Sequence, residues 1–424
     1  MEQIKPIFKN SFEYIKNFIK WLLASLCVGT IGGVIGALFH ICVDKVSEAR
    51  AENSFIIYFL PLAGLVIAFL YYIFRSKGKM DTDRVVKAAA GNDDVPFVMV
   101  PLIFVGTVIT QLFGGSAGRE GAALQIGGGI GYKLGKIFKF NNRDIRLITT
   151  AGMSSVFSAL FGTPVAAAVF PIEMVSVGTL NFTALLPCVV SAITARFVSS
   201  LFGISPIAFD LTFDYTLSAG IMLKVLVLAL LCAILGIIFC FVMKNSEYYM
   251  KKIIPNTFLR AAVGGAIVVL LTVLVGTYDY NGSGMEVITR AVSGNARAWD
   301  FALKIVFTAI TISAGFKGGE IIPTLFIGAT FGCAIASILG FDAGFGAAIG
   351  MVSLFCAVVN CPIASIFLAV EMFGAGGILF FAVACAVSYK MSGYSGLYKS
   401  QKFVYSKLTS SEFIKNDNYQ AKEE

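Results

Sequence analysis

The chain has 424 residues, of which 57% are apolar and 14% are charged, and its mean hydropathy is +0.82. Soluble globular proteins carry about 25% charged residues, so this composition excludes a water-soluble enzyme, a disordered chain and a secreted disulfide scaffold. The 33 Lys and Arg against 25 Asp and Glu give a net charge of +8, but these charges lie between apolar runs, which argues against nucleic acid as a partner and indicates a polytopic membrane protein.

The first 20 residues are predicted to be a cytoplasmic segment and not a signal peptide, because lysines are spread through them. Runs that are apolar and long enough to cross a bilayer follow at about Trp21–Val43, Phe55–Phe74, Phe97–Phe113, Phe182–Phe202, Leu217–Met243 and Phe258–Val275. Basic residues gather in alternate loops, which places both termini on the cytoplasmic side of the plasma membrane. Residues 403–424 are expected to be a short cytoplasmic tail without a regulatory domain.

Cysteine and histidine give no sign of a metal site. The nine cysteines form no Cys-x-x-Cys pair and mostly lie inside apolar stretches, and His40 is the only histidine. We therefore expect buried free cysteines, no metal, no cofactor and no Ser-His-Asp triad. The chain is not predicted to be an enzyme.

Two apolar segments are interrupted by glycine, at 114–135 and at 315–332, the second of which also contains Pro323. A uniform spanning helix does not need so much glycine. Glycine at this density lets helices approach closely, or lets a helix begin inside the membrane where its free backbone groups face protein or a water-filled cavity.

The chain contains an internal repeat. When residues 152–174 are shifted by 198 positions onto residues 350–372, nine of the 23 pairs are identical, including Pro164 with Pro362 and Glu173 with Glu371. We interpret residues 21–202 and 203–402 as two related membrane repeats. Repeats built around interrupted helices are typical of secondary transporters and related channels. The sequence leaves open whether the repeats are parallel or inverted.

Glu120 is the leading candidate for a functional residue. It lies in the string GGSAGREGAALQIGGG, directly before an apolar helical run. A helix N-terminus offers free N–H groups and the positive end of the helix dipole, so a carboxylate and a permeant anion compete for the same place. An ionisable residue at membrane depth is costly and is usually functional; the alternative is a simple helix-capping role.

These motifs resemble those of the CLC family of chloride channels and proton-coupled anion antiporters. GREGA at Gly118–Ala122 is similar to the family's GREGP or GKEGP motif, GGEIIP at Gly318–Pro323 resembles its second-half GxFxP motif, and Phe161–Met174 looks like the helix that follows the first motif. The likeness runs from about Trp21 to Tyr398. It implies an all-α membrane fold with re-entrant helices.

The resemblance also implies roles for individual residues. Glu120 becomes the gate that occupies the anion path when charged, and Tyr398 becomes the donor to a central anion, with Tyr394 as a nearby alternative. The tyrosine at 398 is otherwise an ordinary residue of the membrane interface. The expected anion ligands, mostly at the N-termini of half-helices, are Thr82, Gly118, Arg119, Gly121, Ile321, Ile322 and Tyr398.

The family's GSGIP signature is absent, and Met80–Val85 is its nearest counterpart. Thr82 then takes the serine position, or Met80 does after a slip in register. Two aspartates flank Thr82 and would repel an anion, so we interpret them as caps of a short half-helix. The alternative is a cytoplasmic turn without ligand contact.

Two glutamates are candidates for a proton relay. Glu173 aligns with the first of two acidic positions of proton-coupled members, but the second position is Met174, which cannot carry a proton. Glu173 and its repeat mate Glu371 are alternatively structural carboxylates. Glu320 stands where chloride-selective members have an apolar residue, and a fluoride-exporting, proton-coupled branch resembles this string. That branch typically has a threonine where Ile322 stands here.

The sequence therefore predicts a glutamate-gated transporter of small inorganic anions, with chloride as the first choice, acting as a channel or an anion/proton antiporter. A fluoride/proton antiporter and a proton-coupled carrier of small organic solutes are the alternatives. The resemblance implies a homodimer in a lipid bilayer, and protons are a further partner if transport is coupled.

Overall fold

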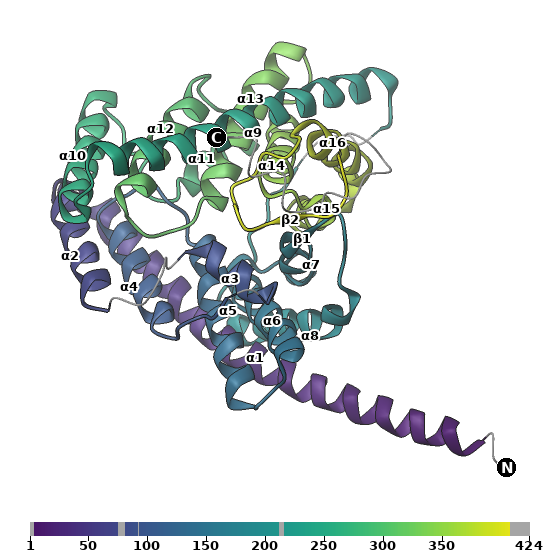
Figure 1. The fold of residues 1–424 in the computed structure, drawn as a ribbon. Coiled ribbons are helices and arrows are strands. Elements are labelled where there is room, and N and C mark those ends of the chain that lie inside the picture. The colour runs from purple at the N-terminus through teal and green to yellow at the C-terminus, as the bar shows by residue number, and fades with distance from the viewer. Residues whose placement is uncertain (1–3, 75–80, 92, 212–215, 408–424) are drawn as a thin grey trace.

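The computed structural model describes residues 4–74, 81–91, 93–211 and 216–407, which fold into an all-α protein (Figure 1). The helices of the first half are α1 (Ile4–Glu52), α2 (Leu60–Ile73), α3 (Thr82–Ala89), α4 (Met99–Leu112), α5 (Glu120–Ile137), α6 (Asn142–Phe161), α7 (Pro164–Val175) and α8 (Leu185–Leu201). Those of the second half are α9 (Ala219–Ile253), α10 (Thr257–Val275), α11 (Met285–Val292), α12 (Asp300–Ala314), α13 (Ile321–Leu339), α14 (Ala343–Val359), α15 (Pro362–Phe373) and α16 (Ile378–Met391). Short 3₁₀ turns lie at Ser54–Phe59, Phe182–Ala184 and Ala375–Gly377.

Six of the described helical segments are long and apolar enough to cross a membrane: Glu13–Glu52, Ser54–Ile73, Phe182–Leu201, Ala219–Ile253, Thr257–Val275 and Ile321–Leu339. They make the chain a multi-pass membrane protein. The expected span Phe97–Phe113 is instead the 14-residue helix α4. It lies within the predicted run, and the chain leaves the helix at Phe113 for the glycine-rich loop that precedes Glu120.

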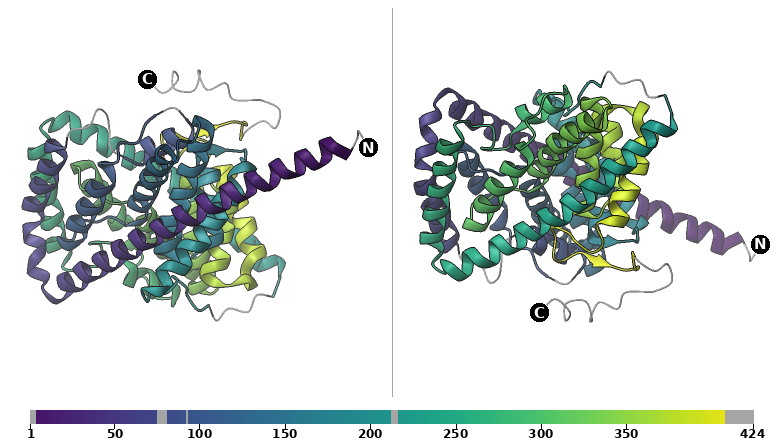
Figure 2. Two further views of the ribbon diagram at one scale, coloured as in Figure 1. Left: turned by 90° about the horizontal axis from the view of Figure 1, so that it is seen from below. Right: turned by 90° about the horizontal axis from the view of Figure 1, so that it is seen from above.

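Helix α1 is longer than the apolar run that predicted it. Its N-terminal part projects beyond the body of the protein, as both views of Figure 2 show. Tyr14 and Ile15 on this part are exposed, whereas Val28 and Ala37 further along are fully buried. The helix thus joins a projecting arm to a packed membrane span.

The two predicted interruptions are present, because α5 begins at Glu120 and α13 begins at Ile321. The loops before them meet in an antiparallel bridge. Gly118 N–H donates to the Gly319 carbonyl at 2.7 Å, and Gly319 N–H donates to the Gly118 carbonyl at 2.8 Å. A Cβ on Gly121 would lie 2.6 Å from Gly319 Cα, so only glycine permits this approach.

Glycine also sets the packing of the helices that follow each interruption. A Cβ on Gly127 would lie 2.1 Å from the Gly152 carbonyl oxygen, where α5 meets α6. A Cβ on Gly328 would lie 2.5 Å from the Gly350 carbonyl oxygen, where α13 meets α14. The same close backbone contact thus occurs once in each half, as expected for small residues at membrane helix interfaces.

The two halves cap each other's helices. Helices α7 and α15 begin with Pro164 and Pro362, which have no N–H, so the next two residues supply the free amides. The Glu173 carboxylate accepts from the N–H groups of residues 363 and 364 at 3.1 and 2.9 Å. The Glu371 carboxylate accepts from those of residues 165 and 166, both at 2.9 Å.

This reciprocal capping determines the relation between the repeats. Each glutamate lies near the C-terminal end of its own helix and reaches the N-terminal end of the other, so α7 and α15 run antiparallel. Equivalent spanning helices run in opposite directions when repeats are inverted. The choice that the sequence left open is therefore resolved in favour of inverted repeats, while the boundary at residue 202 stays a prediction.

The segment after α16 folds back and contacts residues of both halves. Strands β1 (Ser176–Val177) and β2 (Lys402–Phe403) pair in parallel. Lys407 is buried, and its Nζ donates to Asn360 Oδ1 at 2.5 Å and to the Tyr389 carbonyl at 2.9 Å. These contacts fix the segment that carries Tyr398.

The reciprocal caps give a first prediction. Glu173→Ala and Glu371→Ala each leave two backbone amides at the start of the other helix without their acceptor, at a cost of about 1 to 3 kcal/mol for a group that stays unsatisfied. Both variants should lose their monodisperse state in detergent at a lower temperature than the wild type. Glu48→Ala, on an exposed position of α1, is the control and should not change the transition. A Glu173→Ala protein as heat-resistant as the wild type would contradict the capping role.

Candidate functional site

The starts of three helices form the candidate site. Helix α5 contacts both α3 and α13. Thr82 at the start of α3 accepts a hydrogen bond at 3.0 Å from Gln125 Nε2 in the second turn of α5. The free N–H groups of helix N-termini, together with the helix dipole, favour an anion at such a place.

Glu120 is enclosed where α5 begins. Its side chain is only 1% exposed, and its Oε2 accepts a hydrogen bond from the backbone N–H of Arg119 at 2.9 Å. The carboxylate therefore folds back onto the start of its own helix. The carboxyl group thereby lies at the helix start, a place that also favours an anion.

The structure commits two of the expected anion ligands to other partners. Gly118 N–H is used in the bridge to Gly319. Arg119 forms an ion pair with Asp44 of α1, and its Nε lies 3.6 Å from Glu120 Oε1. In this conformation, both residues position the loop and the glutamate, and neither is free for an external anion.

The loop before Glu120 is held by the second half of the chain. Ser116 N–H donates to Thr311 Oγ1, and the Ser116 hydroxyl pairs with that of Thr308, both at 3.1 Å. Asn281 Nδ2 donates to the Gly114 carbonyl at 2.9 Å. These bonds fix the backbone that aims the glutamate.

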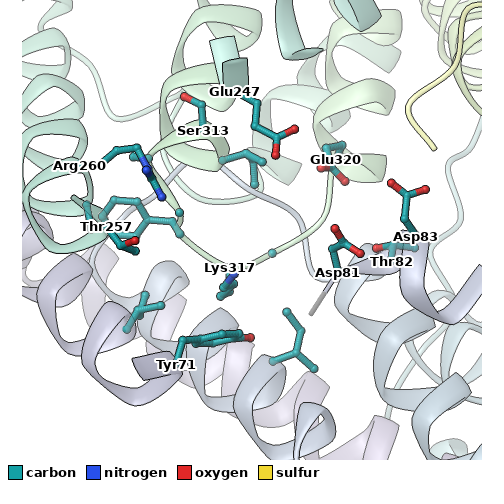
Figure 3. Close-up of a pocket in the computed structure, with 18 of the residues that line it drawn as sticks. Tyr71, Asp81, Thr82, Asp83, Glu247, Thr257, Arg260, Ser313, Lys317 and Glu320 are labelled. Atoms are coloured by element: carbon teal, nitrogen blue, oxygen red, sulfur yellow. The ribbon is translucent and has the colours of Figure 1, made fainter. Parts of the chain in front are cut away.

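A cavity of about 620 Å³ reaches the start of α13 (Figure 3). Its wall includes Glu320, Tyr398, Asp81, Asp83 and Lys317. Ile321 and Ile322 are buried directly behind Glu320, in the first turn of α13. The cavity is large enough for water and ions, and it brings Glu320 together with Tyr398. Glu120 lies outside its wall.

The two candidate tyrosines differ in their partners. Tyr398 is 6% exposed, lines the cavity, and its hydroxyl has no hydrogen-bond partner among the described residues. The Tyr394 hydroxyl pairs with Ser406 Oγ at 3.0 Å and accepts from Lys407 N–H at 3.1 Å. A buried hydroxyl without a partner is costly, so Tyr398 is the better placed donor for a bound anion.

Thr82 is buried, and its two aspartate neighbours have structural partners. Asp81 is the N-cap of α3, where its carboxylate accepts from Arg84 N–H at 3.1 Å. Asp83 accepts from Ser400 N–H at 2.9 Å and thereby ties the Tyr398 segment to α3. The start of α3 is thus the capped half-helix that we expected, and not a loose turn. Met80, the alternative to Thr82, lies outside the described residues.

Glu173 lies at the cap of α15 and is absent from the cavity wall. Its neighbour Met174 is fully buried, and the Met174 carbonyl accepts from Gln401 Nε2 at 3.2 Å. These contacts explain Glu173 as a structural carboxylate. Of the two glutamates predicted as a proton relay, Glu320 is the one that lines the cavity.

Sequence reasoning missed several residues of the site. Asp44, Gln125 and Arg260 come from α1, α5 and α10, and each reaches the site through a contact that spacing does not reveal. Arg260 carried a signal, since a cation inside an apolar run is unusual. Asp44 gave no such signal, because it directly follows the apolar run Trp21–Val43, where a charged residue is ordinary.

Comparisons with known proteins identify the family of the chain. The family described as "Voltage gated chloride channel" matches residues 63–393. The chain belongs to this family. A chloride/fluoride channel protein of Pseudomonas syringae pv. tomato is 32% identical over 92% of this chain and 87% of its own. The H(+)/Cl(−) exchange transporter ClcA of Vibrio cholerae is 28% identical, with 83% of this chain and 81% of its own covered.

Solved structures give the same result. The crystal structure of a CLC-type fluoride/proton antiporter is 31% identical and has a TM-score of 0.87, covering 91% of this chain and 98% of its own. A slow cyanobacterial Cl−/H+ antiporter, 21% identical with a TM-score of 0.77 over 88% and 94% of the two chains, shares the fold. The predicted resemblance to the CLC family, and in part to its fluoride-exporting branch, is confirmed.

The tyrosine hydroxyls give a second prediction. Tyr398→Phe removes the unpartnered donor and should weaken anion binding about 5- to 30-fold, which corresponds to about 1 to 2 kcal/mol for one hydrogen bond. Tyr394→Phe changes the same group four residues away and should leave binding unchanged. Titration of the purified protein with fluoride and with chloride measures both. Equal losses in the two variants would count against Tyr398 as an anion ligand.

Proposed function

We propose that this protein exchanges fluoride for protons across the membrane, as a CLC-type antiporter gated by Glu120. The proposal follows from one arrangement. Glu320 and Tyr398 line the same cavity of about 620 Å³ at the start of α13, and the Glu120 carboxylate is enclosed at the start of α5, across the Gly118–Gly319 bridge.

The anion is held by neutral groups. Helix N-termini and one hydroxyl replace part of its hydration shell without a full positive charge that would trap it. The candidate ligands are the Tyr398 hydroxyl, Thr82 and the first amides of α5 and α13 at Gly121, Ile321 and Ile322. Weak binding of this kind permits release and therefore flux.

Glu120 and the anion alternate in one place. When charged, the carboxylate occupies the start of α5; when protonated, it gives up that position and an anion enters. Glu320 takes protons from the cavity and passes them toward Glu120. Glu120 and Glu320 thus bind protons on the two sides of the central anion, and this arrangement couples the movement of protons to that of the anion.

The choice of fluoride over chloride has two supports. Glu320 replaces the apolar residue of chloride-selective relatives, and two of the similar proteins carry fluoride in their names. Ile322 departs from that branch because it offers no hydroxyl, so chloride is the second candidate. A carrier of organic solutes is the third.

We also propose a plasma-membrane location with both termini in the cytoplasm, because Lys251 and Lys399 line the cavity and loops rich in basic residues are retained inside. A homodimer in the bilayer is part of the same proposal. An apolar hollow of about 410 Å³ between α7, α8 and α15 is consistent with a subunit contact there.

Paired flux measurements test the substrate and the coupling together. Protein reconstituted in liposomes should release fluoride and move protons in the opposite direction at a fixed ratio. Glu320→Gln should keep the anion flux and abolish proton movement, whereas Glu247→Gln, which alters another acid on the cavity wall, should keep both. Chloride flux with proton movement would favour the second candidate, and flux of sugars or amino acids alone would favour the third.

The gate gives a separate prediction. Glu120→Gln cannot ionise at any pH, so its anion flux should no longer vary with pH. The wild-type flux should rise as the pH falls, because protonation releases the carboxylate from the start of α5. Anion efflux measured between pH 5 and 8 compares the two proteins. A pH profile that survives the substitution would remove Glu120 from the gating role.

A further inference from the structure

The cavity has two chemically different sides (Figure 3). Glu320, Asp81 and Asp83 lie on one side, contributed by α3 and the start of α13. Arg260 of α10 lies across from Glu320, and Lys317, in the loop before α13, lies near Tyr71 of α2. We call Arg260, Lys317 and Tyr71 the basic side.

The basic side contains buried donors without acceptors. Arg260 is only 8% exposed, and its Nη1 donates to the carbonyls of Ile254 and Pro255 at 3.2 and 3.5 Å, which caps the end of α9. Its Nε has no hydrogen-bond partner among the described residues, nor has the Tyr71 hydroxyl. An unpartnered buried donor of this kind is costly, so a ligand that accepts from these groups is favoured.

The cations of this side are also not neutralised by an ion pair. Lys317 Nζ lies 4.1 Å from the centre of the Tyr71 ring, and its backbone N–H donates to Thr110 Oγ1 at 3.1 Å. None of the ion pairs found among the described residues involves Lys317 or Arg260. In contrast, Lys251 on the same wall is paired with Glu247.

We infer that the basic side is a second anion-binding site, which receives a small, partly hydrated inorganic anion before it reaches Tyr398. Arg260 Nε and the Tyr71 hydroxyl donate to the anion, and Lys317 supplies positive charge. The cavity volume of about 620 Å³ leaves room for the anion to keep water on its other side.

The division of charge has a functional consequence. Anions follow the basic side, while protons are taken up by Glu320 on the acidic side, so the two ions enter one cavity without meeting on the same groups. This inference rests on the proposed function only for the direction of transport. The binding site itself is a separate claim.

Transport kinetics test the site through a split between KM and kcat. Tyr71→Phe keeps the ring under Lys317 and removes the hydroxyl, and Lys317→Met keeps the length of the side chain and removes the charge. Lys317→Met should raise the KM for the cytoplasmic anion about 10-fold, since one charged contact is lost, and Tyr71→Phe should raise it less. Both should keep kcat and the ratio of anions to protons.

Lys251→Met is the control, because it removes a paired cation from the same wall, and it should leave KM unchanged. A KM that stays at the wild-type value in Lys317→Met and in Tyr71→Phe would overturn the inference.

A binding measurement separates this site from the proposed function. Calorimetric titration of the purified full chain with fluoride, and separately with chloride, is made in the Tyr398→Phe background. The affinity that remains should fall about 10-fold when Lys317→Met is added and persist when Lys251→Met is added. If the wild type carries neither anion in liposomes but this pattern appears, the proposed function fails and the site stands. If the remaining affinity is insensitive to Lys317→Met, the site fails whatever the transport result.

Discussion

The structure depends on how the backbone amides of interrupted helices are satisfied inside a membrane. An N–H group in hydrocarbon costs several kcal/mol unless it has an acceptor, so a helix cannot begin there without a partner. In this protein, the partners at the broken helices come from the other half of the chain. Gly118 and Gly319 pair their backbones, and Glu173 and Glu371 cap each other's helices. The repeats therefore complete each other and could not fold as separate halves without exposing these groups.

The same requirement creates the candidate site. At α7 and α15, a carboxylate from the other helix caps the helix start and has a structural role. A helix start can instead be capped by a carboxylate that moves away, and an anion can then bind there. In the proposed mechanism Glu120 belongs to the second kind, because its carboxylate accepts from the backbone N–H of Arg119 at the start of its own helix and not from another helix. An anion of similar charge can take its place with little change in the local field. Structure and proposed transport thus use one kind of interaction.

Much of this arrangement could be predicted from the sequence, because composition, the 198-residue repeat and the motif around Glu120 are local or periodic signals. The helix starts at Glu120 and Ile321 follow from glycine density. The reciprocal capping could not be predicted, because it depends on the direction of α7 relative to α15. Arg260 and Asp44 reach the site only through tertiary contacts. The apolar run expected at 97–113 is the helix α4, two residues shorter at its start and one at its end.

The hydrogen bond between Asp83 and Ser400 joins residues that are 317 positions apart. Tyr398 follows the last long helix, α16, so it docks against α3 only after the ribosome has delivered nearly all the helices of the bundle. During biogenesis, the inserted helices therefore wait for the segment that carries the hydroxyl proposed to bind the anion. The proposed anion site is completed only when translation has passed this point.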